Sequence, residues 1–206
     1  MLELSYVKFT STLPIFLRSQ VEAEKRMIVV KLSERELAIA ERIALTRQQK
    51  KETFASTRNF KSGVFATSLG VHIIGAKGEV AVARALHWEL NESESVRGDG
   101  GADFIVGRFR IDVQTTSYKP AHLKFDILHP FRSHIAILVQ AEGKRQMRIL
   151  GWIGRRAFER CSTARNYGHG DRLTVDADEL RPISTLQATL DAAEKRYGAQ
   201  MGADLP

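Results

Sequence analysis

Residues Val106-Gly107-Arg108-Phe109 carry the tightest turn signal in the chain. Glycine at the first central position suits a two-residue type II′ turn, so strands are expected to pair on either side of Gly107-Arg108. With that loop, residue 106 pairs with 109, 105 with 110, 104 with 111 and 103 with 112. The register therefore predicts that Asp103 and Asp112 lie directly opposite each other.

Two facing aspartates are electrostatically unfavourable. Directly opposed side chains have Cβ atoms about 5 Å apart, and like charges at that distance destabilise a strand pair. Three arrangements would relieve the repulsion: a shared proton, the neighbouring Arg110 side chain, or a divalent cation between the carboxylates. Oxygen-only ligation suits Mg²⁺ or Mn²⁺, and no histidine or cysteine accompanies the pair to favour zinc. A slipped register with two solvated aspartates is the alternative.

Helical patterns flank this hairpin. Ser33 and Glu36 form a capping box that predicts a helix start, and the stretch from Gly75 to Trp88 predicts a second helix, buried because it is apolar on most sides. Glu79 falls in the first turn of that second helix. Its carboxylate is either an N-terminal charge favoured by the helix dipole or an acid directed into a cleft. Residues 154–162 and a stripe beginning at Leu186 predict two more helices.

The remaining patterns predict the strands and the fold class. Strands are expected at residues 103–106, 109–116, 135–141 and 147–153, and residues 167–182 are expected to be mostly loop. Helices before and after a block of strands indicate an α/β or α+β fold. Residues 1–62 are interpreted as an N-terminal extension with a helical segment, and residues 63–206 as the main domain.

Composition narrows the class of protein. The chain has 43% hydrophobic and 27% charged residues, which is typical of a soluble globular protein. A net charge of +7 and a pI near 9.7 favour a polyanionic partner. The single cysteine, Cys161, forms neither an internal disulfide nor a zinc site. No apolar run of about 20 residues or basic leader is present, so we expect a cytoplasmic protein with no membrane partner.

The acidic residues and their order resemble the PD-(D/E)XK nuclease superfamily. The phrases GAKGEVAVARAL, GGADFIV and FRIDVQTT carry the resemblance: an acid on a helix, an aspartate opening a strand, and a second aspartate on the hairpin partner. They are most similar to small phage and prophage-borne members, over residues 72–153. The resemblance implies an α/β fold with a restriction-endonuclease-like core, in which helices flank a mixed central sheet, after an N-terminal helical extension.

The resemblance also implies an activity, that of a Mg²⁺- or Mn²⁺-dependent endonuclease hydrolysing phosphodiester bonds of DNA. Asp103 and Asp112 would bind the metal, the main-chain carbonyl of Val113 would complete the site, and Glu79 would hold a metal-bound water or a second metal. Gln114 departs from the family, which usually has lysine there. A glutamine amide can orient a water or donate to a phosphate oxygen, but it brings no charge.

Basic residues near these motifs are candidate nucleic-acid contacts, with ordinary solvent exposure as the alternative. They are Lys77, Lys119, Lys124, Arg155 and Arg156. Tyr118 and Phe125 either stack on bases or pack in the core. DNA is the expected partner, and a homodimer would provide two sites for cutting two strands. The alternative functions are a nucleic-acid-binding protein whose Gln114 marks the loss of activity, and a phage protein-interaction module.

Overall fold

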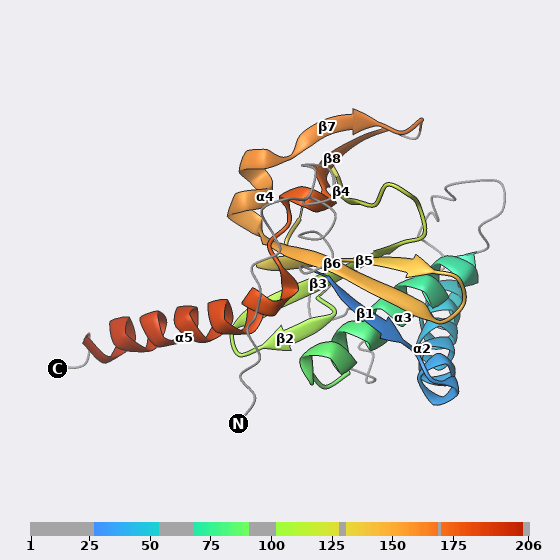
Figure 1. The fold of residues 1–206 in the computed structure, drawn as a ribbon, viewed down its shortest axis with the longest axis horizontal. Helices are drawn as coiled ribbons and strands as arrows, with labels where there is room; N and C mark the ends of the chain where they lie inside the picture. Colours follow the sequence, from blue (N-terminus) through green and yellow to red (C-terminus); the bar gives the residue numbers. More distant parts are fainter. Residues whose placement is uncertain (1–26, 54–67, 91–101, 128–130, 169, 204–206) are drawn as a thin grey trace, which may run out of the picture.

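The computed structural model describes residues 27–53, 68–90, 102–127, 131–168 and 170–203 (Figure 1). In chain order, its elements are β1 (Ile28–Lys31), α2 (Glu34–Thr53), α3 (Ser68–Leu86), β2 (Phe104–Val106), β3 (Phe109–Thr116), β4 (His122–Asp126), β5 (Ile135–Glu142), β6 (Gln146–Gly154), α4 (Arg155–Cys161), β7 (Thr163–Asn166), β8 (Asp171–Asp176), the 3₁₀ turns η1 (Ala177–Glu179) and η2 (Ile183–Thr185), and α5 (Leu186–Ala203).

A five-stranded sheet forms the centre of the molecule, with the strand order β1-β6-β5-β3-β2. Strands β3 and β5 run parallel and the other neighbours antiparallel, so the sheet is mixed. A second, three-stranded antiparallel sheet has the order β4-β8-β7 and lies above the first in Figure 1. The fold is therefore mixed α/β, as the sequence predicts.

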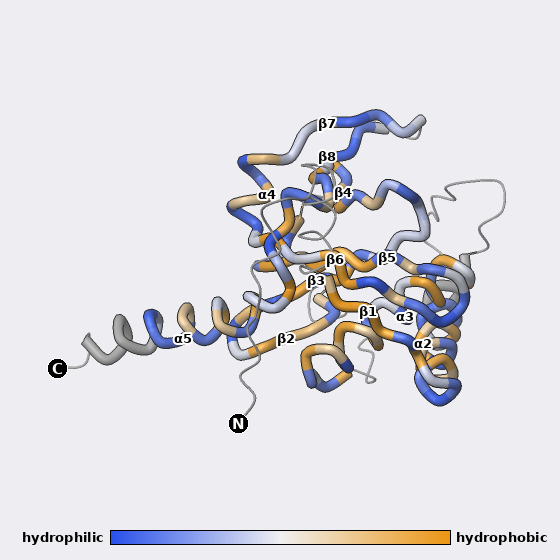
Figure 2. The backbone as a smooth tube through the Cα atoms, in the orientation of Figure 1, coloured by the Kyte–Doolittle hydropathy of each residue, from blue (hydrophilic) through white to orange (hydrophobic). Residues whose placement is uncertain are grey.

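The large sheet is covered on both faces, which explains the unbroken apolar run of β5. Ile135, Ile137 and Val139 belong to the core formed with α2 and α3. Ala136 and Leu138 belong to a second core, formed with the small sheet and α4. Since alternate residues of a strand point to opposite faces, a strand buried on both sides needs apolar residues at every position. Figure 2 shows hydrophobic residues gathered in the central sheet and α3.

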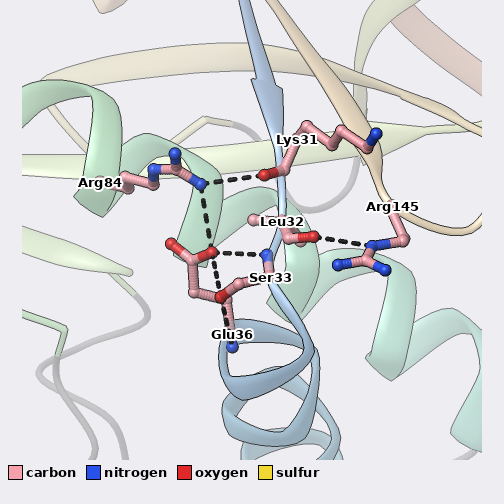
Figure 3. Close-up of polar contacts among 6 residues, drawn as sticks. All are labelled: Lys31, Leu32, Ser33, Glu36, Arg84 and Arg145. Atoms are coloured by element: carbon pink, nitrogen blue, oxygen red, sulfur yellow. Dashed lines mark hydrogen bonds and ion pairs between the residues drawn. The ribbon is translucent and has the colours of Figure 1, made fainter.

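The predicted capping box begins α2 (Figure 3). The main-chain N–H of Ser33 donates to the Glu36 carboxylate at 2.7 Å, and the N–H of Glu36 donates to the Ser33 hydroxyl at 3.3 Å. These reciprocal bonds satisfy two of the N–H groups that the start of a helix leaves without a partner. The helix start expected at Ser33 is confirmed.

Two arginines join this junction to distant parts of the chain (Figure 3). Arg84 of α3 donates to the Lys31 carbonyl, and Arg145, in the β5–β6 turn, donates to the Leu32 carbonyl, both at 2.9 Å. Strand β1 also pairs with β6. The predicted domain boundary between residues 62 and 63 lies outside the described residues. On its N-terminal side, β1 and α2 are built into the central sheet and its helical layer.

Helix α3 packs directly on β3 because Gly78 has no side chain. A Cβ atom at this position would lie well inside van der Waals contact with Thr115 Oγ1 and 3.0 Å from Thr115 Cβ. The close approach brings the next helical residue, Glu79, to the strand that carries Asp112. Gly78 therefore sets the spacing between the two elements that supply candidate acids.

Gly78→Ala is expected to lower the free energy of unfolding by about 1–3 kcal/mol, because the new methyl group overpacks the α3–β3 contact. Gly75→Ala in the same helix is the matched control, since a Cβ at Gly75 has no other atom within 4 Å. That control should be neutral or stabilising by up to about 1 kcal/mol, because alanine is the better helix former. Urea unfolding measures both variants, and equal stabilities would contradict this packing.

Two predictions about local structure are wrong. Helix α3 begins at Ser68 rather than Gly75, so Glu79 lies in the body of the helix and the helix-dipole interpretation of its carboxylate fails. The predicted loop 167–182 contains β8, whose Leu173 and Val175 pack in the second core. Strands β1, β4 and β7, which the sequence did not predict, are short and depend on pairing with distant strands.

Helix α5 extends from the body of the molecule beside the β2–β3 hairpin (Figure 1). The Glu194 carboxylate accepts hydrogen bonds at 3.2 Å from both the main-chain N–H and the Nε of Arg108. The guanidinium of Arg108 also lies 4.3 Å from the centroid of the Tyr197 ring. None of the described helices, α5 included, combines the length and the apolar character that crossing a membrane requires.

Candidate functional site

The β2–β3 hairpin has the predicted register, with Phe104 opposite Ile111. Gly107 has a φ of 57°, and Arg108 is not among the described residues with a positive φ. A type II′ turn requires this combination, a positive φ at the first central residue alone. The turn and the strand pairing are therefore confirmed.

Asp103 contacts the main chain on both sides of Asp112. Its N–H donates to the Ile111 carbonyl at 2.9 Å, and its Oδ2 accepts from the Val113 N–H at 2.7 Å. Main-chain hydrogen-bonding groups of a strand lie in the plane of the sheet, so the Asp103 carboxylate lies near that plane, at the edge of β3. The regular pairing of β2 with β3 ends at Phe104 and Ile111, so Asp103 is a neighbour of Asp112 beyond the paired residues, and the predicted face-to-face position of the two carboxylates stays a prediction.

Asp112 is half-buried on β3 and is held by the segment that precedes β5. Its Oδ1 accepts a hydrogen bond from the hydroxyl of the buried Ser133 at 2.7 Å. Burial raises the pKa of Asp112, although the Ser133 hydrogen bond and the charge of Arg110 oppose that rise. Oδ2 of Asp112 and Oδ1 of Asp103 make no hydrogen bond to another described residue. Each carboxylate therefore keeps one oxygen for a further ligand.

Glu79 approaches the same region from α3, with its side chain 8% exposed. Arg47 of α2 binds both carboxylate oxygens, at 2.5 and 2.7 Å. Bidentate arginine–carboxylate pairs are among the stronger hydrogen-bonded contacts in proteins. The predicted role of Glu79 toward a water or a second metal stays a prediction, and it would require Glu79 to release part of its contact with Arg47.

The pKa of Asp103 is strongly raised. Burial and the negative charge of Glu79 raise the pKa of Asp103 to about 8, with a further contribution from Asp112. The hydrogen bond from Val113 and the charge of Arg47 lower this pKa and only partly compensate. Three carboxyl groups here lie near two arginines, Arg47 at Glu79 and Arg110 near Asp112. With all three carboxyls ionised, the negative charges outnumber the positive ones, and a bound dication would offset the excess.

The main-chain carbonyl of Val113 points to the edge of β3 at which the Asp103 carboxylate lies. In a strand, the N–H and C=O of one residue point to the same side, and the Val113 N–H donates toward Asp103. The carbonyl is therefore directed toward the β2 side of β3. Strand β2 begins opposite Ile111, so the Val113 carbonyl lies beyond the end of β2.

These donors are of the chemical type that a hard dication binds. Two aspartate carboxylates and a main-chain carbonyl form an oxygen-only set, and Mg²⁺ is commonly bound by one or two carboxylates with waters completing its coordination. Within the described ranges, no group of three or more His, Cys, Asp or Glu side chains is placed to hold a metal ion. The candidate site therefore depends on two carboxylates, Asp103 and Asp112, rather than on three.

Gln114 binds the main chain of Lys124. Its Nε2 donates to the Lys124 carbonyl at 2.6 Å, and its Oε1 accepts from the Lys124 N–H at 3.0 Å. The side chain thus joins β3 to β4, a role that the sequence did not indicate. The amide retains one N–H and one lone pair, which the predicted water-orienting role would use.

Two of the predicted nucleic-acid contacts, Lys77 and Lys119, bind the β5–β6 hairpin. Lys77 Nζ donates to the Lys144 carbonyl at 3.0 Å, and Lys119 pairs with Glu142 at 2.9 Å. Glu142 lies six residues along β5 from the partner of Asp112, Ala136, which corresponds to about 20 Å. These two lysines therefore contact a region of the sheet remote from the aspartates.

Arg155 and Arg156 open α4. Arg155 donates to the carbonyl of Arg132 at 3.1 Å, next to the Ser133 that binds Asp112. Arg156 is exposed. Arg155 is thus the predicted basic residue that contacts the segment holding Asp112.

The two candidate stacking aromatics differ in environment. The ring of Phe125 lies 4.7 Å from that of Phe131 and 5.1 Å from that of Phe158, between centroids, so Phe125 packs in the second core. Tyr118 is 67% exposed. The core interpretation is therefore confirmed for Phe125 and is wrong for Tyr118.

The sequence did not indicate Ser133 as a site residue, and it indicated Arg47 only as part of a basic stretch that is either a solvated face or a phosphate-contacting surface, not as a partner of Glu79. Arg47 lies in a polar, basic stretch of α2, and Ser133 lies between β4 and β5, with no local motif around either. Their partners are 32 and 21 residues away in the sequence. Finding them requires knowing how α2 packs on α3 and where the chain enters β5.

Comparison with protein-family models, curated proteins and solved structures gives no match for this chain.

Proposed function

We propose that the chain is a metal-dependent nuclease that hydrolyses phosphodiester bonds of DNA, an endonuclease of the PD-(D/E)XK type with a restriction-endonuclease-like core and a phage or prophage origin. One observation carries the proposal. The hairpin places Asp103 beside Asp112, where the pKa of Asp103 is raised to about 8 by burial and by Glu79. Carboxyl groups whose pKa is strongly shifted by burial and by a neighbouring charge are typical of functional sites.

Asp103, Asp112 and the Val113 carbonyl would hold Mg²⁺ or Mn²⁺. A bound ion would supply positive charge to the scissile phosphate and acidify the attacking water. The chain itself would contribute position and charge around that centre. Ser133 orients Asp112, and the remaining N–H and lone pair of Gln114 can orient a water or donate to a phosphate oxygen. Arg47 brings the positive charge that Gln114 lacks relative to the family lysine.

DNA is the proposed substrate because the chain carries a net charge of +7. Arg155 and Arg156, at the start of α4, are proposed phosphate contacts near the segment that holds Asp112. A homodimer would place two sites on a duplex. A DNA substrate also agrees with the cytoplasmic location that the sequence predicts.

A second candidate is a nucleic-acid-binding protein without catalytic activity. The observation that favours it is the bidentate Arg47–Glu79 pair, which already places a fixed positive charge in the acidic cluster. If Arg47 takes the place of a metal, the protein should bind DNA equally well with and without a chelator.

The test is a cleavage assay on single-stranded, duplex and branched DNA with Mg²⁺, Mn²⁺ or EDTA. The nuclease proposal predicts cleavage of at least one form with Mg²⁺ or Mn²⁺ and none with EDTA. Binding without cleavage of any form under all three conditions would contradict the proposal and support the second candidate.

A further inference from the structure

Lys124 lies between two exposed tyrosine rings. Its Nζ is 3.8 Å from the centroid of the Tyr167 ring and 5.8 Å from that of the Tyr118 ring. Tyr167 is 39% exposed and Tyr118 is 67% exposed. These three residues, here called the tyrosine–lysine surface, bring two exposed aromatic rings and one positive charge together at the small sheet.

Hydrogen bonds fix the main chain under part of this surface. Gln114 of β3 binds the main chain of Lys124 at both its N–H and its carbonyl. Gln140 of β5 donates to the Tyr118 carbonyl at 2.9 Å. The surface is therefore anchored to two strands of the large sheet, while its two tyrosine side chains stay exposed. Because the main chain is already held in place, binding a ligand here costs less conformational entropy.

Among the described residues, no acid pairs with the ammonium group of Lys124. Neighbouring cations of the small sheet are paired: Arg165 with Asp176 at 2.8 Å, and Arg172 with Asp126. Within the described part of the chain, the contacts of the Lys124 ammonium are the two tyrosine rings. A cation–π contact at an exposed site is weak, so the ammonium is available to a phosphate.

We propose that the tyrosine–lysine surface binds the unpaired bases and backbone of single-stranded DNA. Exposed aromatic rings stack on base faces, which a duplex hides and a single strand presents, and Lys124 supplies the contact to an adjacent phosphate. The inference rests on the proposed nuclease function and deepens it by naming the substrate class. Gln114 connects this surface to the site, because it binds Lys124 and lies two residues from Asp112 on β3.

The test is fluorescence anisotropy of a labelled 20-nucleotide oligo(dT) with the full chain in EDTA, where a metal-dependent cleavage cannot interfere. Tyr118→Ala and Tyr167→Ala should each weaken binding by roughly 5- to 100-fold, and Tyr118→Phe should retain it because the ring remains. Lys124→Gln should reduce the slope of log affinity against log salt by about 0.7, the value for one phosphate contact on a single strand.

Tyr197→Ala is the matched control, because Tyr197 is 51% exposed and contacts a cation, Arg108, but lies on α5. It should leave oligo(dT) affinity unchanged. Equal affinities for the Tyr118→Ala, Tyr167→Ala and Tyr197→Ala variants would overturn the inference, as would tighter binding of a duplex of the same length. The binding test contains no metal, so its outcome is independent of the cleavage assay. A failed binding test would not contradict an observed metal-dependent cleavage. A failed cleavage assay would not contradict observed binding of oligo(dT) at this surface.

Discussion

Asp112→Asn is expected to reduce Mg²⁺-dependent DNA cleavage by at least about 100-fold, because the positive charge of a bound metal contributes several kcal/mol to transition-state stabilisation. Asparagine keeps an oxygen that can accept the Ser133 hydrogen bond, so the fold should be retained. The variant removes the negative charge of the Asp112 side chain and changes little else. Initial cleavage rates over a range of Mg²⁺ concentrations measure the effect.

Asp191→Asn is the matched control for this substitution. Asp191 is an exposed aspartate of α5 whose carboxylate accepts a hydrogen bond from Gln187, so the variant makes the same change of charge at a residue outside the proposed ligand set. It should cleave DNA at the rate of the unmodified protein. A purified, folded Asp112→Asn protein with an unchanged rate would remove Asp112 from the mechanism.

Without metal, the stability of the protein should fall as the pH rises from about 4 to about 8, because of Asp103. The pKa of Asp103 is raised to about 8 in the folded chain, whereas an unfolded aspartate titrates near 3.9. Between these values the folded state holds a proton that the unfolded state has released, so raising the pH favours unfolding. The loss should be on the order of a few kcal/mol across the window, measured by urea unfolding in EDTA.

Asp103→Asn separates this effect from other titrations. Asparagine resembles the protonated aspartate and still accepts from the Val113 N–H. The variant should match the unmodified protein near pH 4 and be the more stable one at pH 8 and above. If the two proteins showed parallel stability profiles through this window, Asp103 would not be the titrating group.

The features predicted correctly from the sequence are those fixed by neighbouring residues. The register of β2 and β3 follows from a two-residue turn at Gly107-Arg108, and the start of α2 follows from a capping box that spans Ser33 to Glu36. Strand β5 follows from its continuous apolar run. Each of these signals lies within a few residues, where turn chemistry and periodicity determine the local structure.

The features that escaped prediction depend on contacts between distant segments. The small sheet joins β4 to β8, which is almost fifty residues further along the chain, for example through His122 and Asp176. Arg47 obtains its role only from the packing of α2 on α3. Gln114 has a structural bond to Lys124 because the chain turns back beside β3. Intrinsic propensities of short strands are too weak to indicate such pairings.

The central claim is that Asp103 and Asp112 together bind a hard dication. Calorimetric titration of Mn²⁺ into the unmodified protein, Asp103→Asn, Asp112→Asn and the Asp191→Asn control tests it most directly. The account predicts a binding isotherm for the unmodified protein and the control, and affinity weakened by at least about 10-fold in each hairpin variant. Equal Mn²⁺ affinity in all four proteins, or no binding to the unmodified protein, would contradict it.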